Sequence, residues 1–195
     1  FKGLSIKGII GEYEESLAAV KGITSEPKLI IFLGSSIGNF TMEEAAVLLS
    51  AISNTMSKND SFLIGFDLVK DFTVLNSAYD DAQGVTAKFN LNLLSRINNE
   101  LGGKFDLSKF RHKAFFNSKQ SRIEMHLVST AEHDVCIEAI REKIHFTYGE
   151  TIHTENSYKF TNEMIAGLAS SAGLHIIKKW SDDKNYFGLC MMQKH

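Results

Sequence analysis

Proline and cysteine are scarce in this sequence. Its 195 residues include one proline, Pro27, and two cysteines, Cys136 and Cys190, which lie far apart and have no CxxC partner. A disulfide framework and a cysteine-based metal site are therefore not expected. Because both cysteines lie in alternating apolar runs, we expect two buried free thiols in a protein of the reducing cytoplasm.

Long apolar runs, blocks of like charge and metal-ligand spacings are absent as well. No stretch approaches the roughly 20 apolar residues that cross a bilayer, and Lys2, Lys7 and Glu12 interrupt the place where a signal peptide would be apolar. The formal net charge of -2 gives no positive stripe for nucleic acid or an anionic membrane. The seven histidines show no HxxxH spacing, so we expect no metal. These absences favour small-molecule chemistry and leave the oligomeric state open.

The first segment predicts a strand and a helix. Residues 4–10 alternate as in a short strand that ends at Gly11, and residues 14–20 can form a helix. Since the sequence opens within strand-like residues and without Met, we expect a fragment of a longer protein.

Hydrophobic periodicity next predicts a strand–helix–strand unit. Residues 28–34 (KLIIFLG) form an unbroken apolar run, which is typical of a strand covered on both faces. A capping box at Thr41 opens a helix, and residues 62–69 (FLIGFDLV) predict a second buried strand. The segment is therefore a βαβ unit of a parallel sheet. The apolar stripe of its helix consists of Ala45, Leu49, Ile52 and Met56.

The pattern changes after residue 69. Residues 86–101 show a helical stripe that Gly102 and Gly103 end. Residues 110–129 predict a half-buried antiparallel hairpin, and residues 135–147 continue as short strands. The apolar face of the hairpin carries Ile123, Met125 and Leu127, and its polar face carries Arg122, Glu124 and His126.

The last segment returns to an α/β pattern. Thr161 caps a predicted helix, and residues 175–180 and 186–193 predict two strands. Their short polar connection has no room for a crossover helix, so the strands are antiparallel. We therefore expect an α/β fold in two parts, residues 1–69 and 160–195, with residues 70–159 inserted as an α+β domain.

Ligands of an open α/β sheet bind at the loops that follow its strands. Glu12 and Tyr13 can accept a hydrogen bond from an amine and stack on a purine, although the residues alone favour an ordinary exposed loop. In the loop of residues 34–40 (GSSIGNF), the glycines allow close approach to the backbone and Asn39 offers a donor and an acceptor. This loop favours a ligand site over a structural turn.

The middle of the chain adds a polar and aromatic set. Taken singly, each of its members is more typical of a packed or solvated residue than of a site. The set includes Tyr79, Phe89, Met125, Glu155 and Ser157.

Six motifs, in this order, resemble the histidine-specific N-methyltransferases of ergothioneine biosynthesis. They are FLGSSIGNF (32–40), DLVKD (67–71), AYDDAQGVTAKFN (78–90), RIEMHL (122–127), TENSYKF (154–160) and FGL (187–189). The similarity is collinear from about Gly11 to the end. It implies a class I methyltransferase fold: a Rossmann-like sheet with an inserted α+β substrate domain and a C-terminal antiparallel strand. It also implies S-adenosylmethionine as cofactor and methylation of the α-amino group of histidine, toward trimethylhistidine.

The resemblance assigns the backbone end of the substrate to one loop and one tyrosine. Gly34, Ser36 and Asn39 match the loop that lines the substrate site, and Ser36 stands where the family usually has threonine. Asn39 matches the catalytic asparagine that holds the amino and carboxylate groups. Tyr79 matches the tyrosine that binds the carboxylate.

The resemblance assigns the imidazole end to four residues of the inserted domain. Phe89 and Met125 match residues that wall the ring. Glu155 and Ser157 match the pair that hydrogen-bonds its two nitrogens and so selects histidine.

Cofactor contacts are implied for Glu12, Tyr13, Gly34 and Ser35. The first two match an acid–aromatic pair near the adenine, where the family usually has Asp-Phe. The family's Gly-rich cofactor loop, ribose-binding acid and N-terminal tyrosines precede Phe1, so we expect the complete protein, rather than this stretch alone, to be active.

Two alternatives to histidine methylation stay open. One is methylation of another aromatic amino acid, such as a tryptophan derivative, against which Glu155 and Ser157 argue. The other is a non-catalytic fragment that binds an amino acid.

Overall fold

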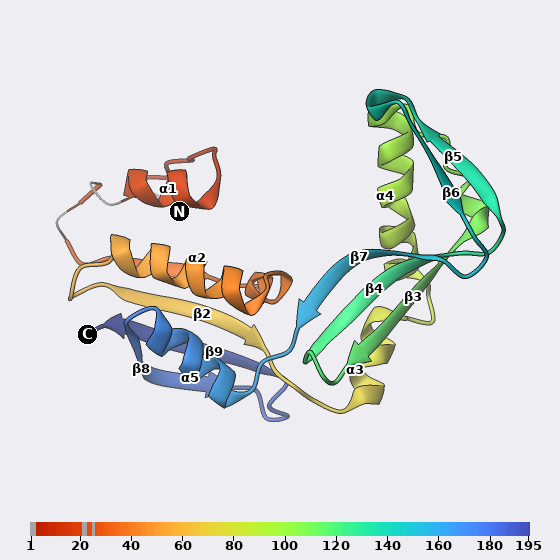
Figure 1. Ribbon diagram of the computed structural model, residues 1–195. Coiled ribbons are helices and arrows are strands. Elements are labelled where there is room, and N and C mark those ends of the chain that lie inside the picture. The colour runs from red at the N-terminus through yellow and green to blue at the C-terminus, as the bar shows by residue number, and fades with distance from the viewer. Residues whose placement is uncertain (1–2, 21–22, 25) are drawn as a thin grey trace. The chain divides into compact units, whose positions relative to one another are not determined.

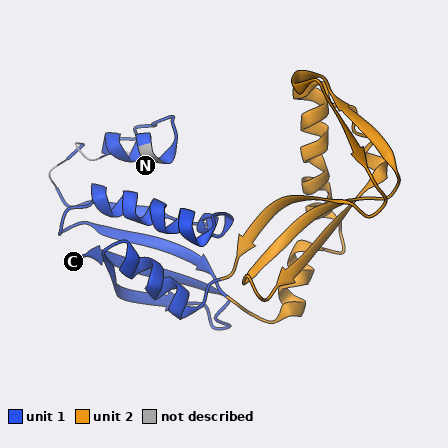
Figure 2. Ribbon diagram, viewed as in Figure 1, with its two compact units in different colours: residues 1–68, 160–195 blue, residues 69–159 orange. Residues whose placement is uncertain are grey.

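The computed structural model describes residues 3–20, 23–24 and 26–195 (Figure 1). The chain divides into two compact units (Figure 2). Unit 1 consists of Phe1–Leu68 and Phe160–His195, and unit 2 consists of Val69–Lys159. Within the described ranges, no helix has both the length and the apolar character needed to cross a membrane.

Unit 1 combines helices with a mixed four-stranded sheet. Its elements are α1 (Tyr13–Val20), β1 (Leu29–Phe32), α2 (Met42–Thr55), β2 (Ser61–Asp67), α5 (Asn162–Ser171), β8 (Leu174–Ser181) and β9 (Phe187–Lys194). The strand order is β1-β2-β9-β8; β1 and β2 are parallel, and β9 is antiparallel to both of its neighbours. Helix α2 packs against α1 and α5. The predicted α/β class, the βαβ unit and the C-terminal hairpin are confirmed.

Helix α2 begins where the sequence predicts it. The hydroxyl of Thr41 accepts a hydrogen bond from the N–H of Glu44, and the carboxylate of Glu44 accepts one from the N–H of Thr41, so the capping box is complete. The predicted stripe of this helix is buried, as are alternate residues of β2. These buried side chains are Ala45, Leu49, Ile52, Met56, Phe62, Ile64 and Phe66.

Two predictions for the N-terminal part of unit 1 are wrong. Residues 4–10 form no strand, because no described strand pairs with them, and Ile6 and Ile10 are 85% and 104% exposed. Strand β1 is not covered on both faces, since Leu29 and Ile31 are each 53% exposed. Within the sheet that the described residues form, β1 lies at the edge, and only its other face is partly covered.

Unit 2 combines helices with two antiparallel sheets. Its elements are α3 (Phe72–Tyr79), α4 (Val85–Leu101), β3 (Phe110–Asn117), β4 (Arg122–Ser129), β5 (His133–Ile137), β6 (Glu142–Phe146) and β7 (Thr151–Tyr158). One sheet has the order β3-β4-β7, and β5 pairs with β6 in the other. Helices α3 and α4 pack against β3 and β4. The predicted α4, which ends at Gly102 with a φ of 64°, and the β3–β4 hairpin are confirmed. The sequence patterns do not predict α3 or β7.

One of the two cysteines differs from its predicted environment. Cys136 is exposed, because it alternates on β5 with Val135 and Ile137, whose side chains point into the core. The prediction of a buried thiol is therefore correct for Cys190 only.

The polar face of the β3–β4 hairpin also differs from the prediction. Half-buried strands predict that this face is exposed to solvent, but it is partly buried. Glu124 is only 7% exposed. It is held there by hydrogen bonds from Arg122 Nη2, at 2.7 Å, and from Asn117 Nδ2, at 2.9 Å.

A β-bulge divides β7 into two parts. Met125 pairs with Glu155, but the next residue of β4, His126, pairs with His153, so Thr154 has no cross-strand partner. The Thr154 hydroxyl donates to the carbonyl of Met125 at 3.0 Å. Because paired residues share a face of the sheet, Glu155 lies on the face of Met125 and His153 on that of His126.

Candidate active site

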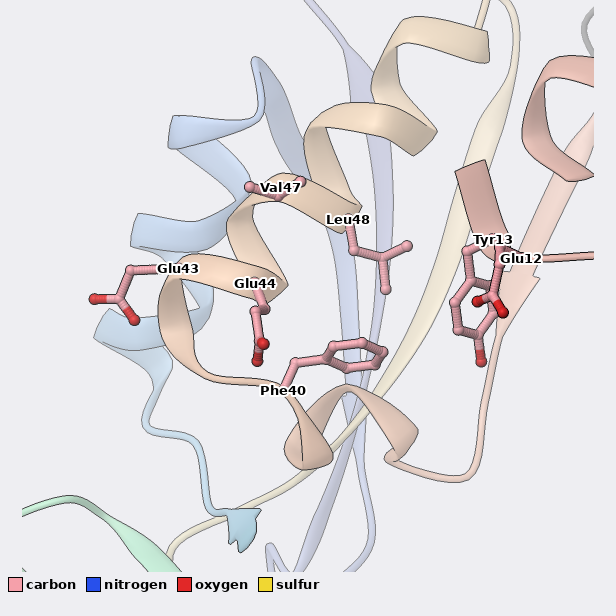
Figure 3. Close-up of a pocket in the computed structure, with 7 residues that line it drawn as sticks. All are labelled: Glu12, Tyr13, Phe40, Glu43, Glu44, Val47 and Leu48. Atoms are coloured by element: carbon pink, nitrogen blue, oxygen red, sulfur yellow. The ribbon is translucent and has the colours of Figure 1, made fainter. Parts of the chain in front are cut away.

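A hollow of about 510 Å³ lies between α1 and α2 in unit 1 (Figure 3). Phe40 and Leu48 point toward Tyr13 across it, and the Tyr13 and Phe40 rings meet edge-on with centroids 6.2 Å apart. Apolar and aromatic walls with carboxylates beside them fit a flat heterocycle that donates hydrogen bonds. The lining residues are Glu12, Tyr13, Phe40, Glu43, Glu44, Val47 and Leu48.

The polar loop after β1 has a fixed backbone. Gly34 has a φ of 79°, a conformation that favours glycine, and Ser35 has a φ of 57°. The Ser35 hydroxyl accepts a 2.8 Å hydrogen bond from the N–H of Asp67, at the end of β2. A 3₁₀ turn, Ser36–Asn39, follows. The loop is thus attached at the carboxyl ends of the two parallel strands, with Asn39 exposed.

Two of the predicted substrate residues in unit 2 meet at a buried lysine. Tyr79 Oη donates a hydrogen bond to Ser157 Oγ at 2.8 Å. The Lys159 ammonium donates to Tyr79 Oη at 2.9 Å and to Ser157 Oγ at 2.7 Å. It also lies 4.7 Å from the centroid of the Tyr79 ring, and Lys159 is 0% exposed. The two hydroxyls are therefore oriented by a cation.

Met125 and Glu155 form a cross-strand pair on the same face. Met125 is buried in an apolar cluster against which Tyr79 packs. Burial raises the pKa of the Glu155 carboxyl, while the Lys159 ammonium acts in the opposite direction.

Phe89 lies beside Glu155 in a shallow hollow of about 160 Å³. It is 65% exposed, so within unit 2 it stands at the rim of the hollow and is not a buried wall. Asn90, Asn92, Leu93, Arg96 and Thr154 complete the lining.

Lys159 is a residue of this cluster that the sequence patterns did not single out. A signal was present, because Glu155, Ser157 and Lys159 alternate at the period of an extended strand and so share one face. The predicted residues of unit 2 are thus linked: Tyr79 bonds to Ser157, and Glu155 adjoins both Met125 and Phe89.

A mixed sheet with a polar loop after its first strand and a last strand in antiparallel orientation agrees with the class I methyltransferase fold that the motifs imply. The chain belongs to the family of histidine-specific, S-adenosylmethionine-dependent methyltransferases, whose model matches residues 1–194.

Three relatives illustrate the range of similarity. The chain is 40% identical to a histidine N-alpha-methyltransferase of Mycobacterium tuberculosis, over 100% of this chain and 60% of that protein. It is 30% identical to ergothioneine biosynthesis protein 1 of Neurospora crassa, over 100% of this chain and 22% of that protein. It is 25% identical to an L-tryptophan methyltransferase of Psilocybe serbica, over 97% of this chain and 55% of that protein. The chain therefore spans about 60% of the length of its bacterial relative.

Proposed function

We propose that this protein transfers methyl groups from S-adenosylmethionine to the α-amino group of histidine, toward trimethylhistidine. Family membership and the 40% identity to a histidine N-alpha-methyltransferase support the reaction. The observation that carries the choice of substrate is the paired placement of Met125 and Glu155, with Ser157 on the same face. Together they offer an apolar surface, an acceptor and a hydroxyl, as an imidazole requires.

Methyl transfer from a sulfonium is an in-line displacement, so the protein must mainly position its reactants and admit a deprotonated amine. In our proposal Asn39 holds the amino and carboxylate groups, and Tyr79 turns its O–H from Ser157 to the carboxylate when the substrate binds. The Lys159 ammonium beside Tyr79 adds the positive charge that a carboxylate favours. Glu155 and Ser157 hydrogen-bond the imidazole nitrogens.

We further propose that residues 70–159 are the inserted substrate domain, and that residues 1–69 and 160–195 belong to the cofactor-binding core. The hollow beside Glu12 and Tyr13 fits an adenine, and Gly34 and Ser35 would contact the same cofactor. The cofactor supplies the methyl group. Two free cysteines support a location in the cytoplasm.

Substrate choice is tested in the intact natural protein by a double variant, Glu155→Ala with Met125→Val. We expect kcat/KM for histidine to fall about 100-fold, because a buried hydrogen bond to a charged group is worth up to roughly 3 kcal/mol. The enlarged and neutral pocket should also accept indoles relatively better. Methylation rates with histidine and with tryptophan measure both effects.

Glu132→Ala is the matched control, since the Glu132 side chain is 75% exposed and should leave both rates unchanged. An unaltered preference for histidine in the double variant would remove the assigned roles of Glu155 and Met125. A wild-type preference for tryptophan would instead favour the activity named in the Psilocybe relative.

Calorimetric titration of the intact natural protein with histidine and with S-adenosylhomocysteine separates an enzyme from a binding module. We expect the intact protein to bind both ligands. Binding of histidine alone by the intact protein would favour the non-catalytic alternative, and binding of neither would contradict the proposal.

A further inference from the structure

The face of β4 and β7 opposite to Met125 carries two histidines and a carboxylate. Glu124, His126 and His153 each offer one ligand atom, and these atoms lie within 4.8 Å of one another. Nε2 of His126 is 3.3 Å from Oε2 of Glu124. The rings of His126 and His153 stack with their centroids 4.5 Å apart. A search for HxxxH misses this cluster because its members come from two strands.

The β-bulge at Thr154 creates the cluster. In a regular ladder His126 would pair with Thr154, and His153 would point to the opposite face of the sheet. The extra residue brings His153 opposite His126 instead. Bulges re-aim side chains in this way and are frequent beside functional sites.

Neighbouring donors orient the Glu124 carboxylate. Its Oε1 accepts hydrogen bonds from Nε and Nη2 of Arg122, at 2.9 and 2.7 Å, and from Nδ2 of Asn117, at 2.9 Å. Its Oε2 is directed at His126. Outer hydrogen bonds of this kind hold a metal ligand in position and balance its charge.

Two buried polar atoms on this face have no hydrogen-bond partner within the described part of the chain. They are Nδ1 of His126 and Oδ1 of Asn156. Asn156 pairs with Glu124 across the two strands, so it shares their face. An unpaired buried polar atom costs about 1–3 kcal/mol, and a water ligand of a bound ion would remove that cost at Oδ1 of Asn156.

We propose that Glu124, His126 and His153 bind a divalent transition-metal ion of the zinc type. Two imidazoles and one carboxylate suit such an ion, whereas magnesium and calcium prefer oxygen ligands alone. His153 is exposed, so the ion can enter from solvent and keep a water ligand. The ion would tie β4 to β7 at the bulge.

The test is a titration of the full, metal-free chain with Zn²⁺ by calorimetry and with Co²⁺ by visible absorption. We expect one equivalent to bind, and His153→Ala and Glu124→Gln each to weaken binding by about 100-fold. The matched control is His145→Ala, because His145 also adjoins carboxylates, at 3.6 Å from Glu132 and 2.8 Å from Asp134. It should bind as the wild type does.

Three results would each overturn the site: no saturable binding by the wild type, undiminished binding by His153→Ala, or an equal loss in His145→Ala. His153 is exposed, so its alanine variant should fold, which circular dichroism checks. Glu124→Gln retains one acceptor oxygen for Arg122 and gives a second, independent result. The site does not depend on histidine methylation, and its failure would leave that proposal unaffected.

Discussion

Lys159→Met in the intact protein is expected to raise KM for histidine about 100-fold. The ammonium orients Tyr79 and Ser157 through hydrogen bonds of 2.9 and 2.7 Å. The same cation attracts the substrate carboxylate that we assign to Tyr79, and a charge-assisted interaction of roughly 3 kcal/mol accounts for an effect of this size. The two hydroxyls keep their bond to each other, so neither is left unpaired in the variant.

Steady-state kinetics measure this effect, and circular dichroism shows whether the variant is folded. Lys119→Met, on the exposed turn of the β3–β4 hairpin, is the control and should have wild-type kinetics. A folded Lys159→Met protein with an unchanged KM would show that the ammonium does not act on substrate binding.

Asp60→Ala is expected to lower the free energy of unfolding by about 3–5 kcal/mol. Asp60 is 0% exposed and accepts hydrogen bonds from the N–H groups of Lys28, at 2.8 Å, and Ser57, at 2.7 Å. The Lys28 ammonium lies 3.0 Å from the same carboxylate. Removal of the Asp60 carboxylate leaves the largely buried Lys28 ammonium and two N–H groups without their acceptor. Urea unfolding measures the loss, and the exposed Asp183→Ala should unfold like the wild type.

The contribution of Asp60 should also depend on pH. Burial by itself raises the pKa of Asp60, but hydrogen bonds from Ser57 and Lys28 outweigh it and hold the pKa well below its ordinary value. As pH falls below about 4, the unfolded chain therefore takes up this proton before the folded chain does. The stabilisation is complete at neutral pH and is lost in acid. The difference in stability between wild type and Asp60→Ala should shrink as pH falls from about 5 to 2. A constant difference would contradict this account.

Elements specified by local signals could be predicted from the sequence. The capping box at Thr41 and the short polar connection before β9 act within a few residues, and both elements formed as expected. The burial of β1 could not be predicted in this way, because the exposure of Leu29 and Ile31 depends on what lies against that face. An apolar run does not contain that information.

The contacts among the candidate site residues could not be predicted from the sequence. The family resemblance picked out Tyr79 and Ser157, but the bond between them and the lysine beneath them depend on how α3 packs against the sheet. The bulge could not be predicted either. The sequence of β7 is compatible with both the regular and the shifted pairing to β4.

At Thr154, the alternation of side chains between the two faces of the sheet shifts by one residue within strand β7. In β7, the residues after Thr154 continue the pairing of Glu155 with Met125. The residues before Thr154 continue the pairing of His153 with His126. Point substitutions on one side can therefore accumulate in evolution without altering which way the other side faces. Deletion of one residue at this position would turn the side chains of residues 151–153 to the opposite face of the sheet. Relatives should therefore tolerate changes of residue type here far better than changes of length.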